Sequence, residues 1–129
     1  MTATETFLLS LDIIQVVGQV RAQKREAFYQ LVLHFYRQAG YRPPSVREAS
    51  RALRAPPDAI RAMLALGLER GEIVESEGIY FAVDTLRQLS HQLQACSPPY
   101  TVKQVRDLTQ TSRRYAYAMR MALVRMGYI

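Results

Sequence analysis

The sequence has almost no cysteine and no long uninterrupted hydrophobic segment. Cys96 is the only cysteine among 129 residues, so neither a disulfide within the chain nor a cysteine-based zinc cluster can form, which fits a reducing compartment. The most apolar stretch, residues 7–20, is interrupted by Ser10, Asp12 and Gln15 and is shorter than a membrane span. No basic residue precedes it, as one would in a signal peptide. We therefore expect a cytoplasmic protein with no membrane partner.

Residues that carry catalytic or metal chemistry are also scarce. The two histidines, His34 and His91, have no companion at a spacing typical of a metal site. Cys96 follows His91 by five residues, which on a helix leaves the two side chains poorly aligned for a Cys–His nucleophile. No segment matches the phosphate-binding pattern G-x-x-x-x-G-K-[ST]. We expect no enzyme activity, no metal, no cofactor and no small-molecule substrate.

Acidic residues are nearly missing from the end of the chain. The formal net charge is +6. Residues 1–40 carry four basic and three acidic side chains, residues 41–96 carry seven of each, and residues 97–129 carry six basic and one acidic. Nearly all the excess positive charge therefore lies in the last segment. Such an asymmetry is typical of a protein with a polyanionic partner.

Apolar residues recur at helical spacing over much of the chain. The spacing predicts an amphipathic helix over residues 23–39, and Ser45 with Glu48 forms a capping box that opens a short second helix. Pro56 and Pro57 suit the entry of a third helix. The residues expected to face inward are Phe28, Leu31, Val32, Phe35, Tyr36, Ala39, Val46, Ala49, Leu53, Ile60, Met63, Leu64 and Leu68.

Two strand-like runs within residues 72–82 flank a turn at Gly78, and Leu86, Leu89 and Leu93 mark the helix that follows. Helix, helix, helix and hairpin in this order are the plan of a winged helix-turn-helix. We predict a mainly α protein with small β-hairpins, built as a tandem winged helix-turn-helix. Its expected parts are a segment in residues 1–22 whose pattern fits a strand or a helix, a winged-helix module in residues 23–96, and an incomplete module in residues 97–129 that lacks its wing.

The second half of the chain repeats the plan of the first half at an offset of 56 residues. Ser45 corresponds to Thr101 and Gly71 to Gly127, so helix caps and helix ends coincide. Few residues are identical between the copies, but the matches fall on structural roles. This distribution favours a true internal repeat.

The repeat reveals a charge reversal at the start of one helix. Residues 56–58 of the first copy hold two prolines and an acid, which suit a helix N-terminus without any ligand. The corresponding residues of the second copy are Ser112, Arg113 and Arg114. Arginine is disfavoured beside the positive end of a helix dipole, by up to about 1 kcal/mol per charge, unless an anion binds there. Free backbone N–H groups and two guanidinium groups together favour a phosphate.

The helix that begins after Ser112 has one apolar and one basic side. At 100° per residue, Ala116, Met119, Leu123 and Met126 share the apolar side, with Tyr115 at its border and Arg120 at its edge. The opposite side carries Arg113, Arg114, Tyr117, Met121 and Arg125. On the preceding helix, Lys103 and Arg106 would add contacts to a nucleic-acid backbone. Tyr117 would stack on a base, which is worth roughly 1 to 3 kcal/mol.

The segment "YTVKQVRDLTQTSRRYA", residues 100–116, resembles the last winged-helix module of the bacterial selenocysteine-specific translation elongation factor. The family pattern there reads approximately T-V-x-x-x-R-D-x-x-x-T-S-R-K-Y-A. "YRPPSVREASRAL" through "LERGEIVESEGIYF" is similar to the module before it, so the resemblance covers roughly residues 23–129. Two parts of the family pattern are not found in these residues. One is the wing that normally flanks the recognition helix, and the other is the GTP-binding domain.

The resemblance implies that the last module binds the stem-loop in messenger RNA, called SECIS, that recodes a UGA codon for selenocysteine. It assigns this role to the matching positions, which are Arg106, Ser112, Arg113, Arg114 and Tyr115. An RNA hairpin is the leading expected partner, with the ribosome as a further one. Because the major groove of RNA is too narrow for a helix, shape and looped-out bases would dominate recognition.

Two other functions remain open on the sequence. A winged-helix regulator would place the same basic helix in the major groove of a DNA duplex. Alternatively, the charge-balanced first module is a protein-interaction or spacer domain, and the basic tail only keeps it soluble. Competition between RNA and DNA distinguishes these functions.

Overall fold

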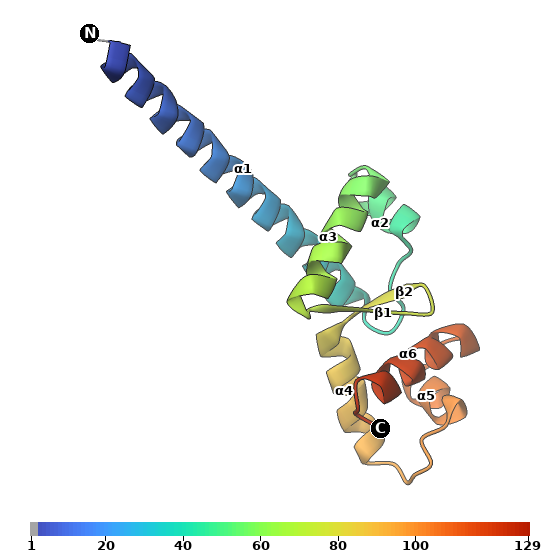
Figure 1. The fold of residues 1–129 in the computed structure, drawn as a ribbon. Coiled ribbons are helices and arrows are strands. Elements are labelled where there is room, and N and C mark those ends of the chain that lie inside the picture. Colours follow the sequence, from blue (N-terminus) through green and yellow to red (C-terminus); the bar gives the residue numbers. More distant parts are fainter. Residues whose placement is uncertain (1–2) are drawn as a thin grey trace.

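The computed structural model describes residues 3–129, with side chains from residue 15 onward. Over these residues the chain forms six helices and one two-stranded antiparallel hairpin. In order they are α1 (Ala3–Ala39), α2 (Val46–Leu53), α3 (Pro57–Arg70), β1 (Ile73–Ser76), β2 (Ile79–Ala82), α4 (Val83–Gln94), α5 (Val102–Thr109) and α6 (Arg113–Arg125). The first three helices gather on one side of the hairpin and the last three on the other (Figure 1). The predicted fold class, a mainly helical tandem winged helix-turn-helix, is confirmed.

The internal repeat is visible in the helix caps. The side chain of Ser45 accepts a hydrogen bond from the backbone N–H of Glu48 at the start of α2, and Thr101 does the same for Gln104 at the start of α5. Only the second pair completes a capping box, because the Gln104 side chain also accepts from the Thr101 N–H. The reciprocal bond predicted for Glu48 does not form, and its side chain lines a groove that faces α6.

The helix α1 runs through two segments that were predicted separately. It is continuous from Ala3, so the strand alternative for residues 1–22 is wrong for residues 3–22, and the first two residues lie outside the described part. The first half of α1 projects away from the other elements (Figure 1), and Val16, Val17 and Val20 are exposed on it. A strand needs a partner for its backbone groups, whereas a helix satisfies them internally. These residues form a helix rather than a strand because no described element lies alongside this part of α1.

The core of the first module lies between α1, α2, α3 and the start of β1. Its buried members are Tyr29, Val32, Leu33, Tyr36, Ala49, Ile60, Met63, Leu64 and Ile73. The predicted inward positions of Leu31 and Leu68 are wrong, since these side chains are 48% and 41% exposed. Gly67 faces inward in place of Leu68, and a Cβ there would lie 2.4 Å from Cγ1 of Ile73. The close approach of α3 to β1 at Gly67 therefore leaves the neighbouring Leu68 facing outward, while Ile60, Met63 and Leu64 are buried as predicted.

The hairpin contributes to both cores. Its turn places Glu77 and Gly78 at positive φ, the geometry of a two-residue type I′ turn, as the glycine predicted. Ile73 packs in the first core, whereas Ile79 and Phe81 are buried in the second core with α4, α5 and α6. The predicted wing of the first module thus also covers the second module.

Two polar contacts fasten the hairpin to α6. The buried Ser76 hydroxyl donates a hydrogen bond of 2.6 Å to the carbonyl oxygen of Ala118 in α6. At the other end of α6, the Arg125 guanidinium donates to the carbonyl oxygen of Glu75. These contacts hold the direction of α6 against the first module.

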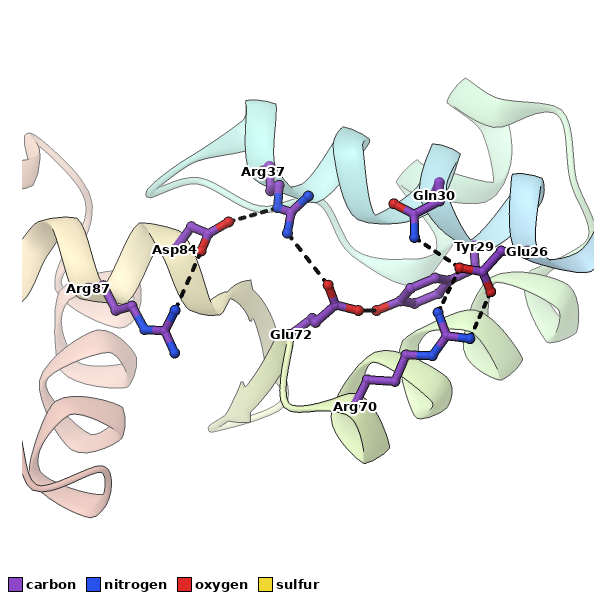
Figure 2. A network of polar contacts seen from close by, with 8 residues as sticks. All are labelled: Glu26, Tyr29, Gln30, Arg37, Arg70, Glu72, Asp84 and Arg87. Atoms are coloured by element: carbon purple, nitrogen blue, oxygen red, sulfur yellow. Dashed lines mark hydrogen bonds and ion pairs between the residues drawn. The ribbon is translucent and has the colours of Figure 1, made fainter.

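A polar network connects α1, the start of the hairpin and α4 (Figure 2). The Arg37 guanidinium lies 3.6 Å from a carboxylate oxygen of Glu72 and 2.8 Å from one of Asp84. The Tyr29 hydroxyl donates to Glu72 over 2.7 Å. Burial, followed by this hydrogen bond, raises the pKa of Tyr29 to about 12. Arg37 therefore links α1 to α4, whose buried leucines pack in the second core.

A second part of the network predicts how acid affects stability. Arg70 donates two hydrogen bonds of 2.9 and 2.7 Å to the Glu26 carboxylate, and these bonds, with one from Gln30, lower the pKa of Glu26 to about 2 (Figure 2). A lowered pKa in the folded state means that the stabilisation is complete above the unfolded value near 4.5 and is lost as the pH falls towards 2. We expect the free energy of unfolding of Arg70→Met to fall less between pH 5 and pH 2 than that of the unaltered protein.

Urea unfolding at several pH values within that window measures this difference. Arg61→Met is the matched control, because Arg61 pairs with Asp58 in an exposed pair on α3. It should leave the pH dependence close to that of the unaltered protein. Equal pH dependence of stability in Arg70→Met and the unaltered protein would contradict the assignment.

Candidate nucleic-acid interface

The helices α5 and α6 form the helix-turn-helix of the second module, and the turn between them is held by buried hydroxyl groups. The Thr109 hydroxyl bonds the carbonyl oxygen of Val105 and lies 2.8 Å from the hydroxyl of Thr111. Ser112 is the N-cap of α6 and accepts from the N–H of Tyr115. The start of α6 is therefore fixed relative to α5.

The basic residues predicted for the interface are exposed and form no ion pair with any residue whose side chain is described. Lys103, Arg106, Arg113 and Arg114 are all solvent-exposed. The first turns of α5 and α6 contain no acidic residue. Within the part of the chain whose side chains are described, the ion pairs involve only Arg37, Arg61, Arg70 and Arg87. The start of α6 is thus an uncompensated positive site, where an anion would be stabilised.

Three of the four cations surround one shallow hollow. Lys103 and Arg106 from α5 and Arg113 from α6 line it, together with Val102. Two guanidinium groups and one ammonium group around an open hollow suit a phosphate, which accepts hydrogen bonds from several donors at once. The structure therefore brings together residues that the sequence placed on two separate helices.

Arg114 points to a different place from Arg113. It lines the groove between the two modules, with Tyr115 beside it and Glu48 among the opposite residues. Tyr115 is half-buried, packs against the second core, and its hydroxyl donates to the carbonyl oxygen of Pro43 over 3.4 Å. Tyr115 joins the modules, so its predicted contact with a nucleic acid would involve only the exposed part of the ring.

The outer side of α6 largely follows the predicted helical phase. Tyr117 is 43% exposed and Met121 is exposed next to it, so Tyr117 is free to stack. Arg120 is half-buried and its Nε donates to the carbonyl oxygen of Tyr100 over 2.6 Å. Arg125 lies outward as predicted, but it is held by the hairpin. The two last arginines of α6 are therefore structural rather than free.

Sequence reasoning missed one residue that supports this interface. The Arg42 guanidinium donates to the carbonyl oxygen of Gln110 at the end of α5. This contact joins residues 68 positions apart. No local pattern could have revealed it, since periodicity and capping signals act only over a few residues.

The residues weighed for catalysis lie apart from the hollow. His34 and His91 are exposed, and Cys96 is partly buried after the end of α4. Among the described residues, no three His, Cys, Asp or Glu side chains gather closely enough to hold a metal ion. No described helix combines the length and apolar character needed to cross a membrane.

Comparison with known proteins reveals a likeness of fold. No protein-family model matches the sequence, and no curated protein matches it. Among solved structures, the mRNA-binding domain of elongation factor SelB from E. coli, in complex with SECIS RNA, superposes with a TM-score of 0.64. The match covers 80% of this chain and 86% of that chain at 19% sequence identity. The two chains share a fold.

The resemblance noted for residues 100–116 names the same elongation factor. At this sequence identity the likeness concerns the fold alone. The choice of residues for the candidate interface rests on the geometry described above.

Proposed function

We propose that this chain binds a hairpin in messenger RNA through Lys103, Arg106, Arg113 and Arg114, and that it catalyses no reaction. The single observation that carries the proposal is the hollow at the start of α6, where three exposed cations converge without a carboxylate. The fold is that of a SelB domain whose structure contains SECIS RNA. Fold and uncompensated charge therefore support the same type of ligand.

In the proposed complex, each of the four cations neutralises one phosphate of the RNA backbone, and the phosphate at Arg113 lies in the hollow. Backbone N–H groups at the start of α6 and the helix dipole add to its stabilisation. The Ser112 hydroxyl accepts from the N–H of Tyr115 through its oxygen, so its proton remains available to a phosphate or a ribose oxygen. Tyr117, exposed one turn further along α6, is placed to stack on an unpaired base.

The finer proposal is that the hairpin is a SECIS-type stem-loop read during selenocysteine incorporation. The support is the T-S-R-R-Y-A motif at residues 111–116 together with the SelB likeness. The protein would then act in the cytoplasm beside a translating ribosome. A DNA duplex is the competing ligand, because winged-helix proteins also bind DNA through the second helix of this motif.

Competition binding at matched salt tests the proposal. A bulged RNA hairpin is expected to bind at least about tenfold more tightly than a DNA duplex of equal length, because looped-out bases and RNA backbone shape are recognised together. With four phosphate contacts, the slope of log affinity against log salt should be about −3 to −4. Equal affinity for the two ligands would favour the DNA-binding function over the RNA-binding function.

A further inference from the structure

The first module also retains unpaired arginines, and they lie together on one helix. Of the seven basic residues between positions 41 and 96, three form ion pairs and Arg42 is bound to Gln110. The remaining three are Arg47 and Arg51 in α2 and Arg54 at its C-cap. All three are exposed, and none has an ion pair or a side-chain hydrogen bond with any residue whose side chain is described. The overall charge balance of this module thus conceals a local positive surface.

The geometry of α2 directs two of these arginines to solvent. Ala49 is fully buried and faces the first core. Arg47 and Arg51 are four residues apart, so they lie one above the other on one face of the helix, about 160° away from Ala49. Glu48 is the only acid in α2. The two arginines therefore form a basic edge along the outer side of α2.

The helix that carries this edge borders the same groove as the interface of the second module. The first turn of α2 and the first turn of α6 line one groove, with Ser45, Val46 and Glu48 on one wall and Arg114 and Tyr115 on the other. Figure 1 shows α2, the hairpin turn and the beginning of α6 on the same side of the molecule. The first turn of α2, which carries Arg47, and the first turn of α6, which carries Arg113 and Arg114, thus border a common groove.

The two modules are held in this arrangement by contacts across their joint. Ser76 bonds α6 from the hairpin, and Tyr115 bonds Pro43 in the loop before α2. Arg42, in the same loop, bonds the end of α5. A ligand that spans both modules would therefore meet a largely preformed surface, which lowers the free-energy cost of binding.

The internal repeat shows which charges of α2 the two copies share, since Arg47 corresponds to Lys103 in the second copy. Arg51 corresponds to Asp107 and Arg54 to Gln110 at the offset of 56 residues. The first copy thus lacks cations at the start of its third helix, where the second copy has them. On α2 it keeps a cation at the position of Lys103 and has a further cation, Arg51, where the second copy has an acid.

We propose that Arg47 and Arg51 bind the phosphate backbone of the same RNA molecule that occupies the hollow at the start of α6. The proposal rests on the proposed function and extends it to the first module. The Glu48 carboxylate in the groove disfavours a phosphate between the modules, so the backbone is held on either side of the groove. The RNA stem must then be long enough to reach from α6 to α2.

The test uses the double variant Arg47→Ala with Arg51→Ala and two bulged RNA hairpins with the same loop. One has a stem of about 16 base pairs, the span of one double-stranded-RNA domain, and the other has about a third of that length. With the long hairpin, the variant should bind about tenfold more weakly, and its salt slope should be less steep by about 1.4 to 1.8. With the short hairpin, the variant and the unaltered protein should bind alike.

Two controls distinguish direct contact with RNA phosphates from a general effect of net charge. Arg47→Lys with Arg51→Lys keeps the charge and should retain the slope with the long hairpin. Arg61→Ala with Arg87→Ala removes the same charge from positions engaged in ion pairs and should leave the slope unchanged. Equal weakening of both hairpins, or the same loss in this second control, would overturn the proposal in favour of a long-range charge effect.

The outcomes also distinguish the two proposals. If Arg113→Ala with Arg114→Ala weakens binding of both hairpins but the α2 variant weakens neither, only the role of the first module is refuted. If the unaltered protein binds neither hairpin better than a DNA duplex, the proposed function fails, and the extension to α2 fails with it. Circular dichroism melts establish that each variant is folded.

Discussion

Replacing Arg113 and Arg114 together by alanine is expected to weaken the binding of an RNA hairpin about 10- to 100-fold and to flatten its salt dependence. Each lost phosphate contact should make the slope of log affinity against log salt less steep by about 0.7 to 0.9. The expectation follows from the exposure of both side chains and from the absence of any acid in the first turn of α6. Titration of a labelled hairpin at several salt concentrations measures both quantities.

The corresponding positions of the first copy supply the control for this experiment. Pro57→Ala with Asp58→Ala changes the start of α3, which carries no cation at these two positions. This variant should bind the hairpin nearly as well as the unaltered protein. Unchanged affinity and slope in the arginine variant would mean that the start of α6 is a solvated face, and the proposed function would lose its basis.

The second large effect concerns stability. We expect Phe81→Ala to lower the free energy of unfolding by about 3 to 5 kcal/mol, the usual cost of removing a fully buried aromatic side chain. Phe81 is fully buried among residues of the second core although it belongs to the hairpin of the first module. Because the hairpin is shared, the two modules should also unfold in one transition.

Urea unfolding followed by far-ultraviolet circular dichroism measures this change. Leu68→Ala is the matched control, since its side chain is 41% exposed on the same module and should cost much less. The shared hairpin would be contradicted if the two modules unfolded in separate transitions and Phe81→Ala shifted neither transition, or only that of the first module. A loss of cooperativity in Phe81→Ala itself would instead be consistent with it, because the mutation removes the coupling contact.

The elements that the sequence predicted well are those set by local interactions. The caps at Ser45 and Thr101, the turn at Gly78 and the helical phase around Met119 depend on residues within about one turn of each position. The phase was wrong at Leu31 and Leu68. In α1, apolar residues lie on more than one side of the helix, and in α3 the contact with Ile73 required a glycine rather than a leucine at the interface.

The sequence by itself determined the repeat, the concentration of positive charge in the last segment, and the reversal of charge at Arg113 and Arg114, because each can be read by comparing positions along the chain. Only the tertiary structure decided that Arg113 joins Lys103 and Arg106 while Arg114 turns to the groove. It also decided that the hairpin serves both cores. Those arrangements depend on side chains that meet across long sequence separations, and local periodicity carries no information about which distant surfaces will pack together.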